Sequence, residues 1–201
     1  KAYIKENLDN DKLNIDFIIE ESTKFVVEKI NIFGNNITQE NVIRNQLELD
    51  EGDPFSEILA KKTENNIKSL NFFKSVNTQI LDGENLNSKI INFKVSEKPT
   101  GEVMAGAGGG TEGGTLFFGV KENNYLGRGL SVDANATISA EAFKGKFSIL
   151  NPNYNNSDKS TFFNIQAIEI DQLKNFGYKT NRTGFELGTG FEYLEDFNLN
   201  L

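Results

Sequence analysis

Residues 130–141 (LSVDANATISAE) alternate between apolar and polar side chains without a break. A period of two puts successive side chains on opposite faces of a β-strand, so this segment predicts a strand with one apolar and one polar face. Residues 142–150 (AFKGKFSIL) and 183–193 (TGFELGTGFEY) repeat the pattern, with lysine or glutamate on the polar side. The second half of the chain is therefore predicted to be sheet.

Six segments of this kind follow residue 102, separated by turn-forming residues. In chain order they are 102–110, 115–122, 130–141, 142–150, 159–173 and 183–193. The fifth segment changes phase near Ala167 and Ile168, where a β-bulge is expected. The connections are the turns TEGG, NNYLGRG and NPNYNNSDK and the longer loop LKNFGYKTNRT.

Strands of this length with two unlike faces are typical of outer-membrane β-barrels, although a soluble sandwich or solenoid alternates in the same way. Charges in the middle of strands, such as Asp133 and Lys144, suit a wet lumen, and short turns alternate with longer loops as on the two sides of an outer membrane. Both features favour the barrel. The smallest such barrels have about eight strands, so six are expected to be part of a larger one.

The first hundred residues change period repeatedly and predict a β-α-α-β-β module. Residues 25–34 alternate as a strand, and a helix over 38–47 is expected to begin at Thr38 as N-cap. Asp53 and Pro54 have the N-cap and N1 chemistry of a second helix that ends near residue 71. Its apolar side is expected to carry Phe55, Ile58, Leu59, Thr63, Ile67 and Leu70. Two strands, 73–81 and 89–97, complete the module.

Residues 15–22 (IDFIIEES) resemble residues 91–98 (INFKVSEK), which close the module. Self-similarity of this kind is typical of tandem modules, so residues 1–22 are expected to be the last hairpin of a preceding copy. A chance likeness between two alternating strands is the alternative.

Residues 101–115 (GEVMAGAGGGTEGGT) are unusually rich in glycine. GGGTEG (108–113) satisfies the G-x-G-x-x-G pattern, but a strand follows it where a dinucleotide site needs a helix N-terminus, so no cofactor is expected. A flexible linker is the second possibility. Because apolar and small residues still alternate, we favour a strand. Because this strand has few side chains, it packs weakly on its neighbours and specifies its register weakly. If it is the first strand of a barrel, we expect a weak seam where it meets the last strand.

Composition narrows the function classes. The chain has no Cys and no His, which excludes thiol nucleophiles, Cys/His zinc sites and histidine-based catalysis, so no enzyme, catalytic residue or metal site is expected. A net charge of −8 disfavours nucleic acid. No apolar run has the length of a spanning helix, and the N-terminus has neither Met nor a targeting pattern, so the chain is expected to be internal to a longer protein.

The order of motifs resembles the BamA family of outer-membrane assembly factors, which join periplasmic POTRA modules to a sixteen-stranded barrel. The likeness is carried by VEKINIFGNNIT (27–38), LNFFKSVNTQI (70–80), FKVSEKPTGEV (93–103), GAGGGTEGG (106–114), NNYLGRG (123–129), LSVDANAT (130–137) and NPNY (151–154). It implies that 1–22 end one POTRA module, 23–98 form the last, and 101–201 begin the barrel. The family's lumenal loop motif would lie beyond residue 201.

The resemblance implies that the chain inserts barrel precursors into a bacterial outer membrane, with the POTRA module in the periplasm. Expected partners are unfolded precursors, accessory lipoproteins and lipid. Glu51 and Arg44 are candidate lipoprotein-docking residues, with ordinary solvated charges as the alternative. Strand addition is expected at two edges, a gate strand in the barrel and an edge of the POTRA sheet. The gate residues are Val103, Met104, Ala105, Gly106, Ala107, Gly108, Gly109 and Gly110, and the POTRA-edge residues are Val76, Asn77, Thr78, Gln79 and Ile80.

Three other functions remain open at this point. A polypeptide-secreting transporter of the same superfamily shares the fold and differs in its cargo. A passive porin or surface-binding barrel lacks a periplasmic β-α-α-β-β module. A soluble adhesin-like sandwich would bury the apolar faces against a second protein layer.

Overall fold

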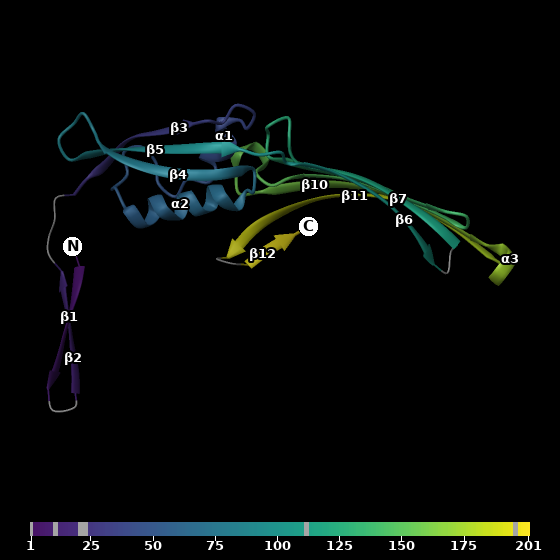
Figure 1. Ribbon diagram of the computed structural model, residues 1–201, viewed down its shortest axis with the longest axis horizontal. Coiled ribbons are helices and arrows are strands. Elements are labelled where there is room, and N and C mark those ends of the chain that lie inside the picture. Colours follow the sequence, from purple (N-terminus) through teal and green to yellow (C-terminus); the bar gives the residue numbers. More distant parts are fainter. Residues whose placement is uncertain (1, 10–11, 20–23, 111–112, 195–196) are drawn as a thin grey trace.

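The structure is a computed structural model that describes residues 2–9, 12–19, 24–110, 113–194 and 197–201. It contains three separate sheets (Figure 1). The first is an N-terminal antiparallel hairpin of β1 (Ala2–Asp9) and β2 (Lys12–Ile19). Among the helices that the structure describes, none combines the length and hydropathy needed to cross a membrane.

The second sheet belongs to an α/β module whose element order is the predicted β-α-α-β-β. Its elements are β3 (Val26–Phe33), α1 (Glu40–Arg44), α2 (Glu57–Ser69), β4 (Phe73–Asp82) and β5 (Ser88–Glu97). The strand order is β3-β5-β4, with β3 parallel to β5 and β4 antiparallel to it. A parallel pair needs a long crossover, and here the crossover contains both helices. The strand β5 is thus central, and β3 and β4 are the two edges.

The core of this module is built from side chains of the sheet and of both helices, and Figure 1 shows α2 running along the sheet. Phe93 and Ile91 on β5 are fully buried, as are Ile43 on α1 and Ile67 on α2. The other buried apolar residues are Val27, Ile30, Val42, Leu49, Ala60, Phe72, Phe73, Val76 and Val95. Burial of so many apolar side chains is what stabilises a module of this size.

Both predicted helix starts were wrong. The N-cap of α1 is Gln39, because the hydroxyl of Thr38 is engaged elsewhere, as a hydrogen-bond acceptor from Asn124. The N-cap of α2 is Ser56, whose Oγ accepts from the N–H of Leu59. Pro54 instead bridges to β3, and Ile58, expected on the apolar side, is 80% exposed.

The third sheet is antiparallel and has seven strands in simple up-and-down order. They are β6 (Gly101–Gly110), β7 (Gly113–Tyr125), β8 (Leu130–Ser139), β9 (Ala142–Asn151), β10 (Ser160–Gln172), β11 (Tyr178–Leu194) and β12 (Phe197–Asn200). The six predicted strands are all present, and β12 is a short addition. Two short helical turns also occur, η1 (Tyr154–Asn156) and α3 (Leu173–Phe176).

The register sorts the side chains of this sheet into two faces, because directly paired residues point to the same side. One row across the strands reads Val103, Val120, Ala134, Phe147, Ile165 and Phe185. The neighbouring row, on the opposite face, reads Glu102, Lys121, Asp133, Ser148, Asn164 and Glu186. In these two rows, the predicted separation of an apolar from a charged face holds across six strands.

Two details of the sheet differ from expectation. No bulge occurs at Ala167 or Ile168, since β10 pairs with β9 and β11 in an unbroken register through both residues. The longer connections also do not lie on one side: 152–159 and 173–177 are at opposite ends of the strands. The predicted TEGG turn includes residues 111–112, which lie outside the described residues.

Candidate strand-addition edges and docking residues

The strand β6 carries the eight predicted gate residues and lies at one edge of the seven-stranded sheet. In the described part of the chain it pairs only with β7, from Gly101–Glu122 to Gly110–Gly113. Its residues 101–109 are all exposed. An edge strand presents one row of backbone N–H and C=O groups that can pair with another chain.

Three glycines of β6 are not required by close packing within this chain. A Cβ added to Gly106, Gly108 or Gly109 would meet no atom within 4 Å. Gly127, in the turn between β7 and β8, is different: it has φ +70° and its Cβ would lie 2.0 Å from the carbonyl oxygen of Ile37. The turn glycine is thus required by the fold, whereas those in β6 leave the strand thin and adaptable.

The predicted POTRA-edge residues lie on β4, at an edge of the three-stranded sheet. Val76 points into the core, and Asn77, Gln79 and Ile80 are exposed. The hydroxyl of Thr78 donates to Glu64 of α2 at 2.7 Å, which ties the strand to the helix behind it. In the described part of the chain β4 pairs only with β5, so its outer edge is a second candidate for strand addition.

The opposite edge, β3, is covered by the segment between the helices. Backbone bonds join Val27 N–H to Asp53 at 2.8 Å, Gly52 N–H to Val27 at 2.7 Å and Phe55 N–H to Phe25 at 2.8 Å. These contacts occupy the first half of the edge. Strand addition at β3 would have to displace them.

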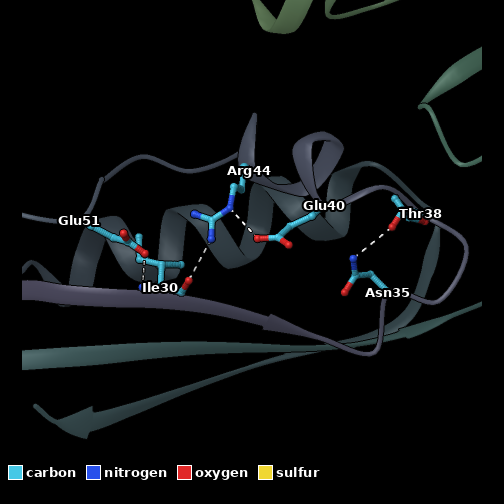
Figure 2. Close-up of polar contacts among 6 residues, drawn as sticks. All are labelled: Ile30, Asn35, Thr38, Glu40, Arg44 and Glu51. Carbon is cyan, nitrogen blue, oxygen red and sulfur yellow. Dashed lines mark hydrogen bonds and ion pairs between the residues drawn. The ribbon is translucent and has the colours of Figure 1, made fainter.

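Glu51 and Arg44 complete this cover, as Figure 2 shows. The N–H of Ile30 donates to Glu51 Oε1 at 3.0 Å, and Arg44 Nη2 donates to the carbonyl of Ile30 at 3.2 Å. Arg44 also pairs with Glu40, Nε to Oε1 at 2.7 Å. The structure therefore brings the two predicted docking residues together at one residue of β3. Both side chains remain exposed and accessible to a partner.

Glu97, at the end of β5, was not identified from the sequence. Its carboxylate accepts the backbone N–H groups of Asn36 at 3.0 Å, Ile37 at 3.0 Å and Thr38 at 2.6 Å. Burial opposes ionisation, but the hydrogen bonds, led by those from Thr38, outweigh it and hold the pKa of Glu97 below its usual value. The contacts span about sixty residues of chain, so no local pattern signals them.

Glu64 on α2 was also missed, since an acidic residue in a helix reads as solvent-facing. It is buried, and burial opposes ionisation. Hydrogen bonds from Lys61, Lys68 and Thr78 nevertheless lower the pKa of Glu64 from 4.5 to about 2. Within the described residues, no group of three or more acidic side chains is arranged to hold a metal ion.

Comparison with known proteins identifies relatives for both parts of the chain. Residues 25–98 match the family described as "POTRA: Surface antigen variable number repeat". The outer membrane protein assembly factor BamA of Buchnera aphidicola is 28% identical over 199 residues, which make up 95% of this chain and 32% of that relative. BamA of Neisseria meningitidis is 26% identical over 164 residues, 80% of this chain and 21% of that relative.

Solved structures show the same fold. The crystal structure of BamA from Haemophilus ducreyi lacking POTRA domains 1–3 has a TM-score of 0.74 at 22% identity, covering 98% of this chain and 38% of that one. CdiB from Escherichia coli has a TM-score of 0.57 at 14% identity, covering 96% and 37%. These likenesses confirm the predicted fold class, an α+β POTRA module followed by part of an antiparallel barrel. The chain spans about a third or less of the length of the two BamA sequences, and 37–38% of the two solved chains.

Proposed function

Since this chain belongs to the BamA family, with an outer-membrane barrel and a periplasmic POTRA module, we propose that it takes part in folding and inserting β-barrel precursors into the bacterial outer membrane. The relatives are named as assembly factors, and the proposal involves no bond chemistry and no cofactor. The domain boundaries we propose are 1–22 for the end of a preceding POTRA module, 23–98 for the last POTRA module and 101–201 for the first barrel strands.

The scarcity of side chains on β6 is the observation that carries this proposal. A precursor entering the membrane has unpaired backbone N–H and C=O groups, which are costly in hydrocarbon. A strand that supplies hydrogen bonds at the moment of entry removes that cost. The strand β6 is the first strand of the barrel sheet and has few side chains to hold it against a neighbour. In the complete barrel it would meet the last strand, and this seam would open for the precursor.

The POTRA module would hold precursors before they reach the seam. Of its two edges, β3 is covered by residues 50–55 and by Arg44 and Glu51, whereas β4 is uncovered. We therefore assign precursor binding to β4, through backbone pairing at 76–80. Backbone pairing is largely independent of sequence, which suits a module that handles many different precursors.

Arg44 and Glu51 are proposed to dock an accessory lipoprotein. The two side chains carry opposite charges, and both are hydrogen-bonded to the backbone of Ile30 on β3. Together they offer a partner two polar contacts at a fixed spacing. Electrostatic pairs of this kind set the orientation of a partner more than its affinity.

Crosslinking tests the template. Single cysteines placed along 102–110 are expected to form disulfides with a cysteine in the edge strand of a stalled precursor. The matched control is Thr137→Cys on β8, a strand paired on both sides, which is expected to give no crosslink. If the β6 cysteines crosslink only to the protein's own last strand during active assembly, the template proposal is wrong.

The transporter and porin alternatives are less well supported. Both named sequence relatives are assembly factors, which favours assembly over secretion of a polypeptide through the lumen. A transporter would show crosslinks from cargo to the polar face, at residues such as Lys146 and Glu186, and none to β6. A porin would show high and steady conductance in a planar bilayer.

A further inference from the structure

The loop between β3 and α1 is fixed against the turn between β7 and β8. The N–H of Gln39 donates to the carbonyl of Gly127 at 2.8 Å, and Asn124 Nδ2 donates to Thr38 Oγ1 at 2.9 Å in a buried contact. Asn124 Oδ1 accepts from the N–H of Gly129 at 2.8 Å, which closes the turn itself. These contacts join the POTRA module directly to the end of the barrel sheet.

Ile37 lies at the centre of this junction, but its side chain is left outside. Its backbone N–H is held by Glu97, and its carbonyl packs against Gly127 too closely for any Cβ there. The side chain nevertheless remains 71% exposed. Hydrogen bonds and close packing thus fix the backbone of the loop, while its isoleucine side chain faces outward.

Two more large side chains are exposed beside it. Tyr125 and Leu126 are 46% and 69% exposed and, with Ile37, line a hollow of about 600 Å³ that also reaches Pro99 and Gly101. Exposed apolar residues are ordinary when scattered singly, but a group of three on a shared hollow marks an interaction surface. We call Ile37, Tyr125 and Leu126 the junction cluster.

The register shows which side of the sheet this cluster faces. Between Glu122 and Tyr125 the pairing with β8 shifts, and Tyr125 then pairs with Leu130 while Glu122 pairs with Val132. Leu130 and Val132 are two residues apart, so both lie on the apolar face. Tyr125 therefore faces the same side as Phe118 and Val120, at the end of the strands next to the POTRA module. Through Tyr125, the junction cluster adjoins the apolar face of the barrel sheet.

We propose that the junction cluster is an interfacial anchor that inserts into the boundary between headgroups and acyl chains of the inner leaflet, beside the start of β6. The proposal rests on the barrel spanning the membrane as proposed above. Tyrosine is enriched at this depth in membrane barrels, and burying an exposed isoleucine or leucine in lipid is favourable because it removes apolar surface from water. The anchor would hold the POTRA module at one height beneath the seam, where an incoming strand must be delivered.

Lipid contact is measured with nitroxide spin labels in the full-length protein reconstituted into phospholipid vesicles. Residues 1–201 contain no cysteine, so Ile37→Cys and Leu126→Cys introduce single label sites once any cysteine elsewhere has been replaced. Collision with oxygen reports lipid, and collision with a water-soluble nickel chelate reports water. The labels at 37 and 126 are expected to collide several-fold more with oxygen, relative to nickel, than a water-exposed label.

Two control sites make the outcomes separable. Leu86→Cys lies in the same POTRA module, between β4 and β5, and is 95% exposed, so its label is expected to report water. Phe118→Cys lies on the apolar face of β7 and is expected to report lipid. Lipid contact at 118 with water contact at 37 and 126 overturns the anchor and leaves the proposed function intact. Water contact at 118 as well overturns the membrane placement itself. Protection of 37 from both reagents shows cover by protein and also overturns the anchor.

Discussion

The β3 edge of the POTRA sheet and the β6 edge of the barrel sheet differ in what lies against them. At β3, the backbone of residues 50–55 and the side chains of Arg44 and Glu51 occupy the groups that another strand would use. At β6, the outer row of backbone groups has no strand partner among the described residues, and a Cβ added to Gly106, Gly108 or Gly109 would meet no atom within 4 Å. Natural sheets usually protect their edges. In the complete barrel β6 would meet the last strand, so the feature that distinguishes it within this chain is its lack of side chains. A strand of this kind would leave the seam with few contacts to hold it closed.

Apolar side chains show the same contrast. In the POTRA module they converge on a protein core, with Phe93 and Ile43 fully buried. In the barrel sheet they stay on one exposed face, where Phe185 is 80% exposed. The alternation along each strand is similar, so alternation alone does not tell whether protein or lipid covers the apolar face. The helices of the module make the difference, because they supply the second layer.

The largest expected effect comes from truncating a core ring. Phe93→Ala is expected to lower the free energy of unfolding of the POTRA module by about 3–5 kcal/mol, since the cavity it leaves lies at the centre of the sheet. The matched change Phe185→Ala removes the same atoms from the apolar face of β11 and leaves no protein cavity. It is expected to change local stability by no more than about 0.5 kcal/mol.

Amide hydrogen exchange of β5 and β11 in the reconstituted protein measures both changes. Equal losses at the two strands would mean that Phe185 packs against protein. The comparison between a protein core and a lipid-facing sheet would then fail.

Glycine substitutions give the next largest effect. Gly127→Ala places a Cβ 2.0 Å from the carbonyl oxygen of Ile37, at a φ of +70°, and is expected to destabilise the junction by at least about 1–3 kcal/mol. Gly108→Ala meets no atom in this chain and restricts the unfolded state, so it is expected to stabilise β6 by about 0.4–1 kcal/mol. By stiffening the seam, it should also slow precursor insertion.

Exchange of the Gln39 amide, which donates to Gly127, reports the junction, and insertion of a barrel precursor into vesicles reports the seam. A loss of stability from Gly108→Ala comparable to that from Gly127→Ala would show that the β6 glycines are required for packing. The proposed adaptability of β6 would then have no support.

Much of this architecture is readable from local sequence. The period of two predicted the strands and their faces, and the change of period predicted the β-α-α-β-β order. What failed depends on distant residues. Thr38 has the chemistry of an N-cap, but its hydroxyl bonds Asn124, eighty-six residues away. Glu97 reads as a surface acid, yet three backbone N–H groups from another loop converge on it. Hydrogen bonds between residues far apart in the chain produce no periodic pattern in the sequence.

Some features of the candidate sites could likewise be predicted from local sequence, and others depend on distant residues. Glycine content predicted a strand of low packing at 103–110, and the structure places it at an edge. The cover over β3 was not foreseen, because it depends on Glu51 and Arg44 meeting the same residue from different parts of the fold. Whether these sites bind precursors and a lipoprotein stays a prediction.

A smaller effect is expected from acid at the uncovered POTRA edge. Hydrogen bonds hold the pKa of Glu64 at about 2, below its unfolded value of 4.5. The stabilisation is therefore fully present above pH 4.5 and is lost as the pH falls towards 2. It is expected to amount to about 1–2 kcal/mol, because both lysine partners lie largely in solvent. Exchange of β4 amides between pH 5 and pH 2.5 measures it, and Glu64→Gln should remove the dependence. A pH response that persists in that variant would assign it to another carboxylate.

The smallest effect separates the two roles of Glu51. Glu51→Ala leaves the Ile30 N–H to water and is expected to lower the stability of the β3 edge by about 0.5–1.5 kcal/mol, with faster exchange of that amide. Glu51→Gln keeps a carbonyl oxygen able to accept the same hydrogen bond, so its exchange should stay near that of the parent protein. Docking of a lipoprotein through charge should instead be weakened equally by both variants, measured by co-purification of the complex. Suppose that Glu51→Gln docks normally while Glu51→Ala does not. The lipoprotein would then recognise the hydrogen-bonded β3 edge rather than the charge of Glu51. The same contact would both protect that edge and bind the lipoprotein.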